Sequence, residues 1–227
     1  MPTPSGKIYD RLLSLPLFQG LSQDDLSTIV ETTRFDFRSY APGETIVRTD
    51  APCTHLCIIM NGAIEVVTRS DDHSYQLMER LATPLLMEPE RLFGLHQFHT
   101  REVKSLEKCQ VLAIEKDAVL RLSAEYLVFR INLLNGLAAV NQRQLRQAWH
   151  PAPKALTTRI VRFVEQRALR PAGYKELHIK MTHLADELND SRLDVSRALH
   201  DLQSRGFVTL RRGTIVFPTF EDAIRNG

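Results

Sequence analysis

Seven short strand-like segments between Arg34 and Ile114 constrain the fold of this chain more than any other feature. They are RFDFRSY, ETIVR, HLCIIM, AIEVVTRS, SYQLMERL, REVKSLE and CQVLAI, and turn-forming sequences such as Ala41-Pro42-Gly43 separate them. Short strands at this spacing are typical of an antiparallel roll or barrel. Within it we expect Asn61-Gly62 to close a type I′ hairpin, because both residues tolerate a positive φ.

Helical patterns flank this strand-rich segment on both sides. Residues 5–33 carry apolar side chains at helical spacing in two pieces, and Ser22 is expected to cap the second piece. After Glu115 the pattern becomes helical again, and a long segment without proline runs from Ala124 to Trp149. The chain is therefore expected to belong to the α+β class, with helices before and after an antiparallel β-roll.

The long helical segment carries two apolar stripes, which need two different partners. One stripe consists of Leu127, Ile131, Leu134, Ala138 and Leu145, and the other of Phe129, Leu133, Leu137 and Val140. We expect one to pack on the roll and the other on a second copy of the helix, giving a parallel homodimer whose register Asn141 would fix. The alternative is a single amphipathic helix packed within one domain.

The prolines of His150-Pro151-Ala152-Pro153-Lys154 cannot continue this helix and predict a hinge. We therefore expect three parts: a sensor β-roll over residues 1–122, a dimerisation helix over 123–149 and a smaller domain over 150–227. The third part holds 13 Lys and Arg against 9 Asp and Glu, whereas the rest holds 16 against 18, within a net charge of +2. A basic surplus there suits a nucleic-acid partner.

The smaller domain contains a helix-turn-helix pattern followed by a two-stranded wing. THLADEL predicts a short helix capped by Thr182, and Asn189-Asp190 predicts a turn. In the following SRLDVSRALHDLQSRGF segment, Ser191 and Asp194 have the spacing of a capping box. The expected buried side of this second helix consists of Val195, Ala198, Leu199 and Leu202. FVTLR and TIVF then flank Arg212-Gly213 as a hairpin.

The exposed face of the second helix suits DNA recognition. That face consists of Arg192, Leu193, Ser196, Arg197 and His200, with Ser191 at the tip. The second helix of a helix-turn-helix enters the major groove, where an arginine fork can donate to both O6 and N7 of guanine. Arg212 in the wing is placed to meet phosphate. The alternative is a helical hairpin with a solvated face and a structural role.

In the order of these segments the sequence resembles the Crp/Fnr superfamily of bacterial transcription regulators. PLFQGLS, YAPGETIVR, HLCIIMNGAIEVV, the long helix and the winged helix-turn-helix occur in family order. The resemblance implies a cyclic-nucleotide-binding-like jelly roll, a long dimerisation helix and a C-terminal DNA-binding domain. It also implies a homodimer that binds palindromic double-stranded DNA and meets RNA polymerase.

SRLDVSRAL resembles the recognition helix of this family, usually S-R-E-T-V-x-R. Arg192 and Arg197 match the two arginines that contact bases or phosphates, whereas Leu193 stands where the family usually has a glutamate that accepts from cytosine. Leucine cannot accept a hydrogen bond and suits an apolar neighbour such as a thymine methyl group. The sequence therefore predicts a half-site different from the TGTGA that is common in the family.

The sensor region departs from the family members that bind cyclic nucleotides. Those members carry a Gly-Glu pair for the ribose and an Arg-Ser or Arg-Thr pair for the cyclic phosphate. Here Glu88 lacks the glycine and precedes Pro89, and Thr100-Arg101 has the two residue types reversed. Glu88, Thr100 and Arg101 are the candidate effector-binding residues, with Arg101 as the phosphate partner. The alternative is that Arg101 lies on a strand and faces solvent. We expect a small-molecule effector other than cyclic AMP.

The cysteines and histidines bear on two sensor chemistries other than an organic effector, an iron–sulfur cluster and haem. Cys53, Cys57 and Cys109 form no CxxC pair and are too few for an iron–sulfur cluster, so we interpret them as small buried hydrophobic residues. A haem- or redox-sensing regulator is the alternative. Its axial ligands would come from His55, His96, His99, Met60 and Met87. We interpret the histidines as surface or hydrogen-bonded residues and expect no haem.

The enzyme alternative is a cupin-like metal site seeded by His96-Gln97-Phe98-His99. The downstream glutamate and histidine of cupins are missing, and this alternative leaves residues 154–217 unexplained, so we expect a regulator without a catalytic or metal site. The sequence shows neither an apolar run long enough for a membrane helix nor a signal-peptide pattern near its start. These features predict a cytoplasmic protein with no membrane partner.

Overall fold

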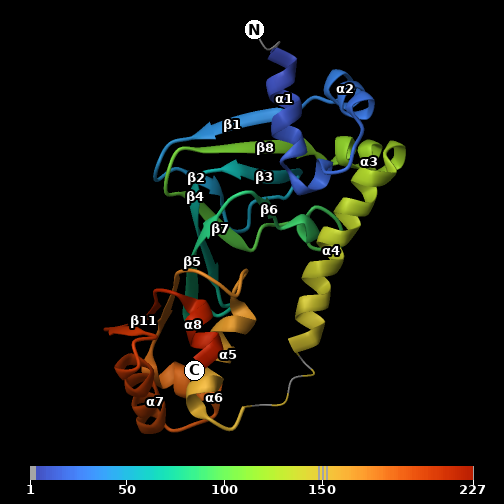
Figure 1. The fold of residues 1–227 in the computed structure, drawn as a ribbon. Coiled ribbons are helices and arrows are strands. Elements are labelled where there is room, and N and C mark those ends of the chain that lie inside the picture. Colours follow the sequence, from blue (N-terminus) through green and yellow to red (C-terminus); the bar gives the residue numbers. More distant parts are fainter. Residues whose placement is uncertain (1–3, 148, 150, 152, 227) are drawn as a thin grey trace.

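The computed structural model describes residues 4–147, 149, 151 and 153–226 (Figure 1). The chain begins with α1 (Pro4–Leu13), the 3-10 turn η1 (Pro16–Phe18) and α2 (Gln23–Thr32). The Ser22 hydroxyl accepts a hydrogen bond from the Asp25 amide at 3.1 Å, so Ser22 caps α2 as predicted. Leu12, Phe18 and Ile29 are buried in a core that these helices share with the roll.

The roll consists of strands from two antiparallel sheets. One sheet has the order β1 (Asp36–Tyr40), β8 (Cys109–Glu115), β3 (His55–Asn61) and β6 (Leu85–Met87). The other contains β5 (Tyr75–Ala82), β4 (Ala63–Arg69), β7 (Arg101–Ser105) and β2 (Thr45–Val47) as neighbours. Apolar side chains from both sheets, including Ile59 and Val66, form a shared core. The expected antiparallel roll is confirmed.

The Asn61-Gly62 turn does not close a hairpin, so this prediction was wrong. β3 pairs with β6 and β8, whereas β4 pairs with β5 and β7, and the turn carries the chain from one sheet to the other. Gly62 has a φ of +93°, and a Cβ there would lie 2.6 Å from the Cys109 sulfur. The positive φ is present at Gly62 but not at Asn61, and the flanking strands belong to different sheets.

Two helices replace the single long helix expected from Ala124. α3 (Lys116–Glu125) ends at Tyr126, whose backbone is extended, and α4 (Leu127–Gln147) follows. Phe129 and Leu133 of α4 are buried against the roll. The other stripe is exposed, at 45–59% for Leu127, Ile131, Leu134 and Leu145. One predicted stripe therefore packs on the roll, and the other has no apolar partner within the described chain.

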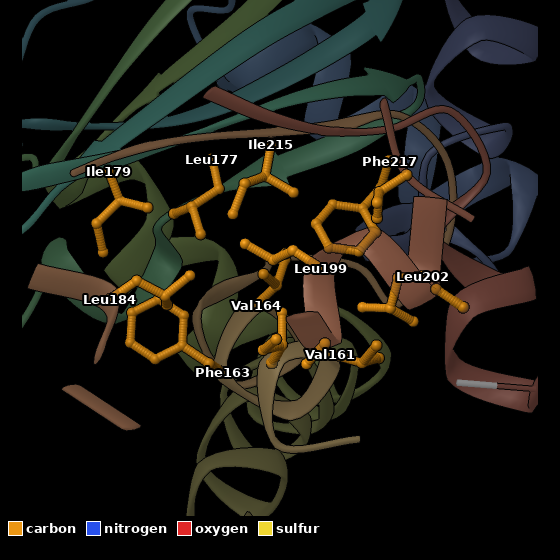
Figure 2. Packing of buried hydrophobic residues seen from close by; sticks show 14 of the residues in the cluster. Val161, Phe163, Val164, Leu177, Ile179, Leu184, Leu199, Leu202, Ile215 and Phe217 are labelled. Atoms are coloured by element: carbon orange, nitrogen blue, oxygen red, sulfur yellow. The ribbon is translucent and has the colours of Figure 1, made fainter. Parts of the chain in front are cut away.

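The C-terminal elements form a second compact unit, which we call the winged unit. They are α5 (Leu156–Arg167), β9 (Lys175–Ile179), α6 (Met181–Leu188), α7 (Arg192–Ser204), β10 (Thr209–Arg211), β11 (Thr214–Phe217) and α8 (Phe220–Asn226). Figure 2 shows their core, in which Phe163, Leu199 and Phe217 meet the apolar side chains of the strands. The predicted helix-turn-helix and wing are present in the expected order.

One seven-stranded sheet joins the winged unit to the roll. Its order is β10-β11-β9-β5-β4-β7-β2, and Leu77 of β5 pairs with Leu177 of β9 in antiparallel register. Figure 1 shows β5 extending from the roll down to the winged unit. Of the predicted hinge, His150 and Ala152 lie outside the described residues, so the domain boundaries drawn there stay predictions. None of the described helices is long and apolar enough to span a bilayer.

Candidate DNA-binding and effector sites

The start of α7 is fixed by the predicted capping box. The Ser191 hydroxyl accepts a hydrogen bond from the Asp194 amide at 3.0 Å and donates one to the Asp194 carboxylate at 2.6 Å. The same carboxylate lies 3.3 Å from the Arg197 guanidinium. Asp194 is therefore engaged within the helix, and it holds Arg197 only by an exposed pair of small energetic value.

The two faces of α7 divide as the sequence predicts. Val195, Ala198, Leu199 and Leu202 are buried in the winged-unit core. Arg192, Leu193, Arg197 and His200 are exposed, and Ser196 is half-buried. The ring of His200 lies 2.7 Å from the Ser196 carbonyl oxygen. The candidate reading face is therefore assembled on one side of a helix whose other side is anchored.

The turn before α7 has the predicted conformation, but α6 is not capped as expected. α6 starts at Met181 after Lys180, which makes no side-chain cap, so Thr182 lies inside the first turn and the predicted cap was wrong. Asn189 adopts a left-handed conformation with φ +48°. The Arg159 guanidinium donates to the Asp190 carboxylate at 2.9 Å. This ion pair ties the turn between α6 and α7 to α5.

The wing places two arginines at its tip. β10 and β11 pair antiparallel, and the turn between them contains exposed Arg212 and Gly213, whose φ is +70°. Arg211, at the end of β10, is exposed as well. Two guanidinium groups at this tip are placed to meet an anionic backbone.

The three candidate effector residues lie together around Glu88. One carboxylate oxygen of Glu88 accepts hydrogen bonds from the Thr100 amide at 3.1 Å, the Thr100 hydroxyl at 2.5 Å and the Arg101 guanidinium at 3.0 Å. The other oxygen lies 2.9 Å from Nδ1 of His99. Glu88 is only 4% exposed and has a φ of +36°. The sequence did not single out His99 for this cluster, although it precedes Thr100 directly.

The electrostatics of this cluster favour its charged form. Burial raises the pKa of Glu88, but hydrogen bonds from His99 and Thr100 and the charge of Arg101 outweigh it, so the net shift is downward. Burial also lowers the pKa of His99, but hydrogen bonds to Cys53 and Glu88 raise it to about 9. Arg101 lies 3.8 Å from Glu90 too. Its charge is therefore compensated inside the protein, and its expected role toward a phosphate stays a prediction.

His99 and the three cysteines, which the haem, redox and metal alternatives involve, lie within the roll. His99 is buried and bonded to Glu88 rather than exposed. Cys53 and Cys109 are buried, and burial raises the pKa of the Cys57 thiol to about 11. Within the described ranges, no group of three or more His, Cys, Asp and Glu side chains could hold a metal ion.

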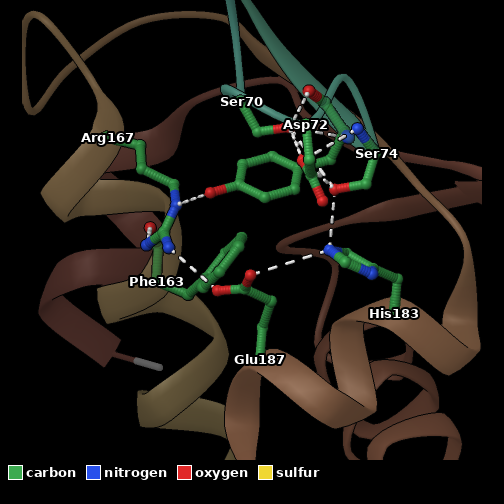
Figure 3. Close-up of polar contacts among 8 residues, drawn as sticks. Ser70, Asp72, Ser74, Phe163, Arg167, His183 and Glu187 are labelled. Atoms are coloured by element: carbon green, nitrogen blue, oxygen red, sulfur yellow. Dashed lines mark hydrogen bonds and ion pairs between the residues drawn. The ribbon is translucent and has the colours of Figure 1, made fainter.

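Polar contacts join the β4–β5 hairpin to the winged unit (Figure 3). The Ser74 hydroxyl lies 2.8 Å from Nε2 of His183 on α6. The Arg167 guanidinium of α5 donates to the Tyr75 hydroxyl at 2.8 Å and to Glu187 at 3.1 Å. Leu77 of β5 lies in the apolar core of the winged unit. The hairpin therefore contacts both helices that precede α7.

A fully buried ion pair completes this junction. The Lys175 ammonium of β9 lies 3.1 Å from the Glu79 carboxylate of β5, and both side chains are 0% exposed. Glu79 also accepts a hydrogen bond from the Leu169 amide at 2.8 Å, and Lys175 donates to the Ala172 carbonyl oxygen at 2.7 Å. A buried pair persists only where further hydrogen bonds satisfy both ions, as they do here.

This architecture is similar to that of known proteins. Residues 37–126 match the family described as cyclic nucleotide-binding domain. The chain is similar to a protein described as a transcriptional regulator of the Crp/Fnr family from Eubacterium rectale, with 17% identity, a TM-score of 0.51 and coverage of 94% of this chain and 99% of that one. It is also similar to the catabolite activator protein of Thermus thermophilus, with 20% identity, a TM-score of 0.48 and coverage of 93% and 97%.

A third similar structure is DNR from Pseudomonas aeruginosa, with 17% identity, a TM-score of 0.46 and coverage of 95% of this chain and 96% of that one. No sequence among curated proteins matches this chain. The family match covers the roll and α3, and the structural similarity extends the shared fold to the winged unit. Residues 37–126 thus match the cyclic nucleotide-binding domain family, and the whole chain shares its fold with the regulator from Eubacterium rectale.

Proposed function

We propose that this chain is a sequence-specific DNA-binding transcription regulator that acts as a homodimer under the control of an effector other than cyclic AMP. The observation that carries the proposal is α7, with Arg192, Leu193, Arg197 and His200 exposed on one side and an apolar core on the other. A capped helix of this kind presents its first turns to the major groove, and the wing adds Arg212 for phosphate. Such a protein works in the cytoplasm, where the DNA and RNA polymerase are.

The dimer rests on the exposed stripe of α4. Leucine and isoleucine side chains recur there at helical spacing, while the opposite stripe is buried in the roll. A second copy of α4 is the simplest partner for this stripe. Pairing of the two α4 helices would also give the dimer two α7 helices, one for each half of a palindromic site. Half-sites about one helical turn apart, roughly 34 Å, are the geometric expectation.

Glu88 and Arg101 are arranged in a way that disfavours binding of cyclic AMP. Both oxygens of Glu88 have partners in the protein, and Arg101 is paired with that carboxylate. A cyclic phosphate needs a guanidinium that is free to compensate for lost hydration. Calorimetric titration of the full chain with cyclic AMP should therefore show no binding, and micromolar affinity would contradict this part of the proposal.

The DNA-binding function is tested by selecting sites from random double-stranded DNA with the purified protein. We expect a palindromic site whose half-sites differ from TGTGA, and footprinting across the genome of the source organism should then return the same site near promoters. Recovery of no enriched sequence would overturn the proposal. Recovery of TGTGA half-sites would refute only the role given to Leu193.

A further inference from the structure

A cleft of about 970 Å³ opens where the roll meets the winged unit. We call it the junction cleft. The β4–β5 hairpin forms one wall, through residues 68–76. Thr49 and Asp50 line it from the segment before β3, Arg91 from the end of η2 (Pro89–Arg91), and His178 from β9. Thr100, which bonds Glu88, lines it as well, so the cleft borders the Glu88 cluster. The volume is within the range of small-molecule sites.

Three polar groups that line the junction cleft lack partners. The Nε of Arg91 and the hydroxyl oxygens of Thr49 and Thr68 are buried, and none has a hydrogen-bond partner among the described residues. Buried polar groups in native structures are almost always hydrogen-bonded, so three unpaired groups on side chains that line one cleft indicate a place where a ligand can be bound. A guanidinium Nε and two hydroxyls can all donate to an oxygen-rich ligand.

The charge of Arg91 indicates what that ligand must be. Arg101 is compensated by Glu88 and Glu90, whereas Arg91 makes no ion pair within the part of the chain that is described. The cleft also contains Asp50 and Asp71, which are exposed and not paired with Arg91. A partly buried guanidinium without a carboxylate partner is best satisfied by a carboxylate or phosphate oxygen.

We propose that the junction cleft binds a small anion of the carboxylate or phosphate class, with Arg91 as its charge partner and the Thr49 and Thr68 hydroxyls as donors. This assigns the effector of the proposed regulator to the cleft that borders the Glu88–Arg101 cluster at Thr100, with Arg91 rather than Arg101 as the charge partner, and it rests on that proposed function. Ser74, Tyr75 and His178 line the same cleft. A bound anion therefore contacts the hairpin and the winged unit together.

The contact with both units gives the anion a route to α7. Tyr75 bonds Arg167 of α5, and Ser74 bonds His183 of α6. A ligand that binds this arrangement of roll and winged unit more tightly than other arrangements would increase the population of this arrangement. The size of the shift depends on the difference in affinity. The recognition helix would then be placed by the sheet and the hairpin as well as by α4.

The test is thermal unfolding of the full chain in inorganic phosphate, in succinate, and in sodium chloride at matched ionic strength, with anion concentrations around 10 mM. We expect phosphate or succinate to raise the melting temperature above the chloride value, and the effective anion distinguishes the phosphate from the carboxylate source. Arg91→Gln should weaken the apparent affinity by about tenfold or more, because it removes the charge from the hydrogen bond.

Two further variants keep the test decisive. Thr68→Val removes a donor while preserving the side-chain shape, and it should weaken binding. It provides the test if Arg91→Gln does not fold. Arg48→Gln removes a neighbouring exposed arginine that does not line the cleft and should bind as the wild type does. The proposal is overturned if neither anion exceeds chloride, or if both cleft variants bind like the wild type. Site selection with α7 variants tests DNA binding separately.

Discussion

At the scale of single residues, Leu193 is the most informative position of the candidate DNA interface. It is 60% exposed at the first turn of α7, between two residues that face solvent. Leu193→Glu introduces an acceptor for the cytosine amino group and should change the preferred base at one position of each half-site. Site selection with both proteins measures this directly. An unchanged preference at every position would show that Leu193 does not face the bases.

Arg197 should contribute affinity whether it meets a base or a phosphate. Its side chain is 70% exposed and only loosely paired with Asp194. If Arg197 reads a guanine, Arg197→Ala should weaken DNA binding by about 1–3 kcal/mol and relax the specificity at one position of the site. If Arg197 contacts a phosphate, the same substitution should weaken binding to all DNA sequences equally. Gel-shift titrations on the selected site and on unrelated DNA separate the two. Arg225→Ala, an exposed arginine on α8, is the charge-matched control and should bind normally.

His99 gives the roll a pH dependence of defined sign. Its folded-state pKa is about 9, against an ordinary value of 6.5, so the stabilisation is complete below about pH 6.5. Between pH 6.5 and 9 the unfolded chain loses the proton that folded His99 retains. The free energy of unfolding should therefore fall by an amount on the order of 3 kcal/mol across this range. Urea unfolding across this range should show that decline in the wild type but not in His99→Gln. Parallel profiles would contradict the assigned pKa.

At the scale of elements, local patterns predicted most strands and helices, and contacts distant in sequence decided the rest. The seven expected strands of the roll are present, whereas β6 and α8 were not anticipated because their sequences are too short to show a period. Asn61-Gly62 led to a wrong hairpin prediction. These residue types indicate a turn in the backbone, but they do not determine whether the strands on either side pair with each other. The break at Tyr126 likewise has no breaker residue in the sequence.

The exposed stripe of α4 belongs to the same scale, because its partner is not visible in one chain. Leu134→Glu should convert a dimer into a monomer, since a charge would be buried in a helix–helix seam. Leu120→Glu on α3 is the matched control, because Leu120 is 50% exposed and lies outside the stripe. Sedimentation equilibrium reports the oligomeric state of each variant. Identical masses for the wild type and Leu134→Glu would argue for the single-helix alternative.

At the scale of the whole molecule, the candidate sites are connected by contacts that no sequence pattern reveals. The sequence grouped Glu88, Thr100 and Arg101 correctly, because the family resemblance marks these positions. It did not reveal the ion pair between Arg101 and Glu88, which depends on side-chain orientation within the roll, and the effector role of Arg101 stays a prediction. The pairing of β5 with β9 was equally hidden, because strand edges that meet between two units leave no periodic signal.

The buried pair of Glu79 and Lys175 tests whether the two units are held as one body. Lys175→Met leaves a buried carboxylate without its cation and should reduce the free energy of unfolding by about 3–5 kcal/mol. Glu79→Gln combined with Lys175→Met should recover part of this loss, because glutamine keeps an acceptor for the Leu169 amide without the charge. Lys104→Met breaks a more exposed pair with Glu102 and should cost about 0–1 kcal/mol.

The shape of the unfolding transition distinguishes a local defect from a loss of docking. If β5, Glu79 and Tyr75 couple the units, calorimetry should show one transition for the wild type and two for Lys175→Met, with the winged unit and the roll melting separately. A single transition in both proteins, with a loss no larger than that of Lys104→Met, would mean that the sheet pairing alone holds the junction. In that outcome the hairpin backbone, rather than the ion pair, would carry any coupling between the junction cleft and α7.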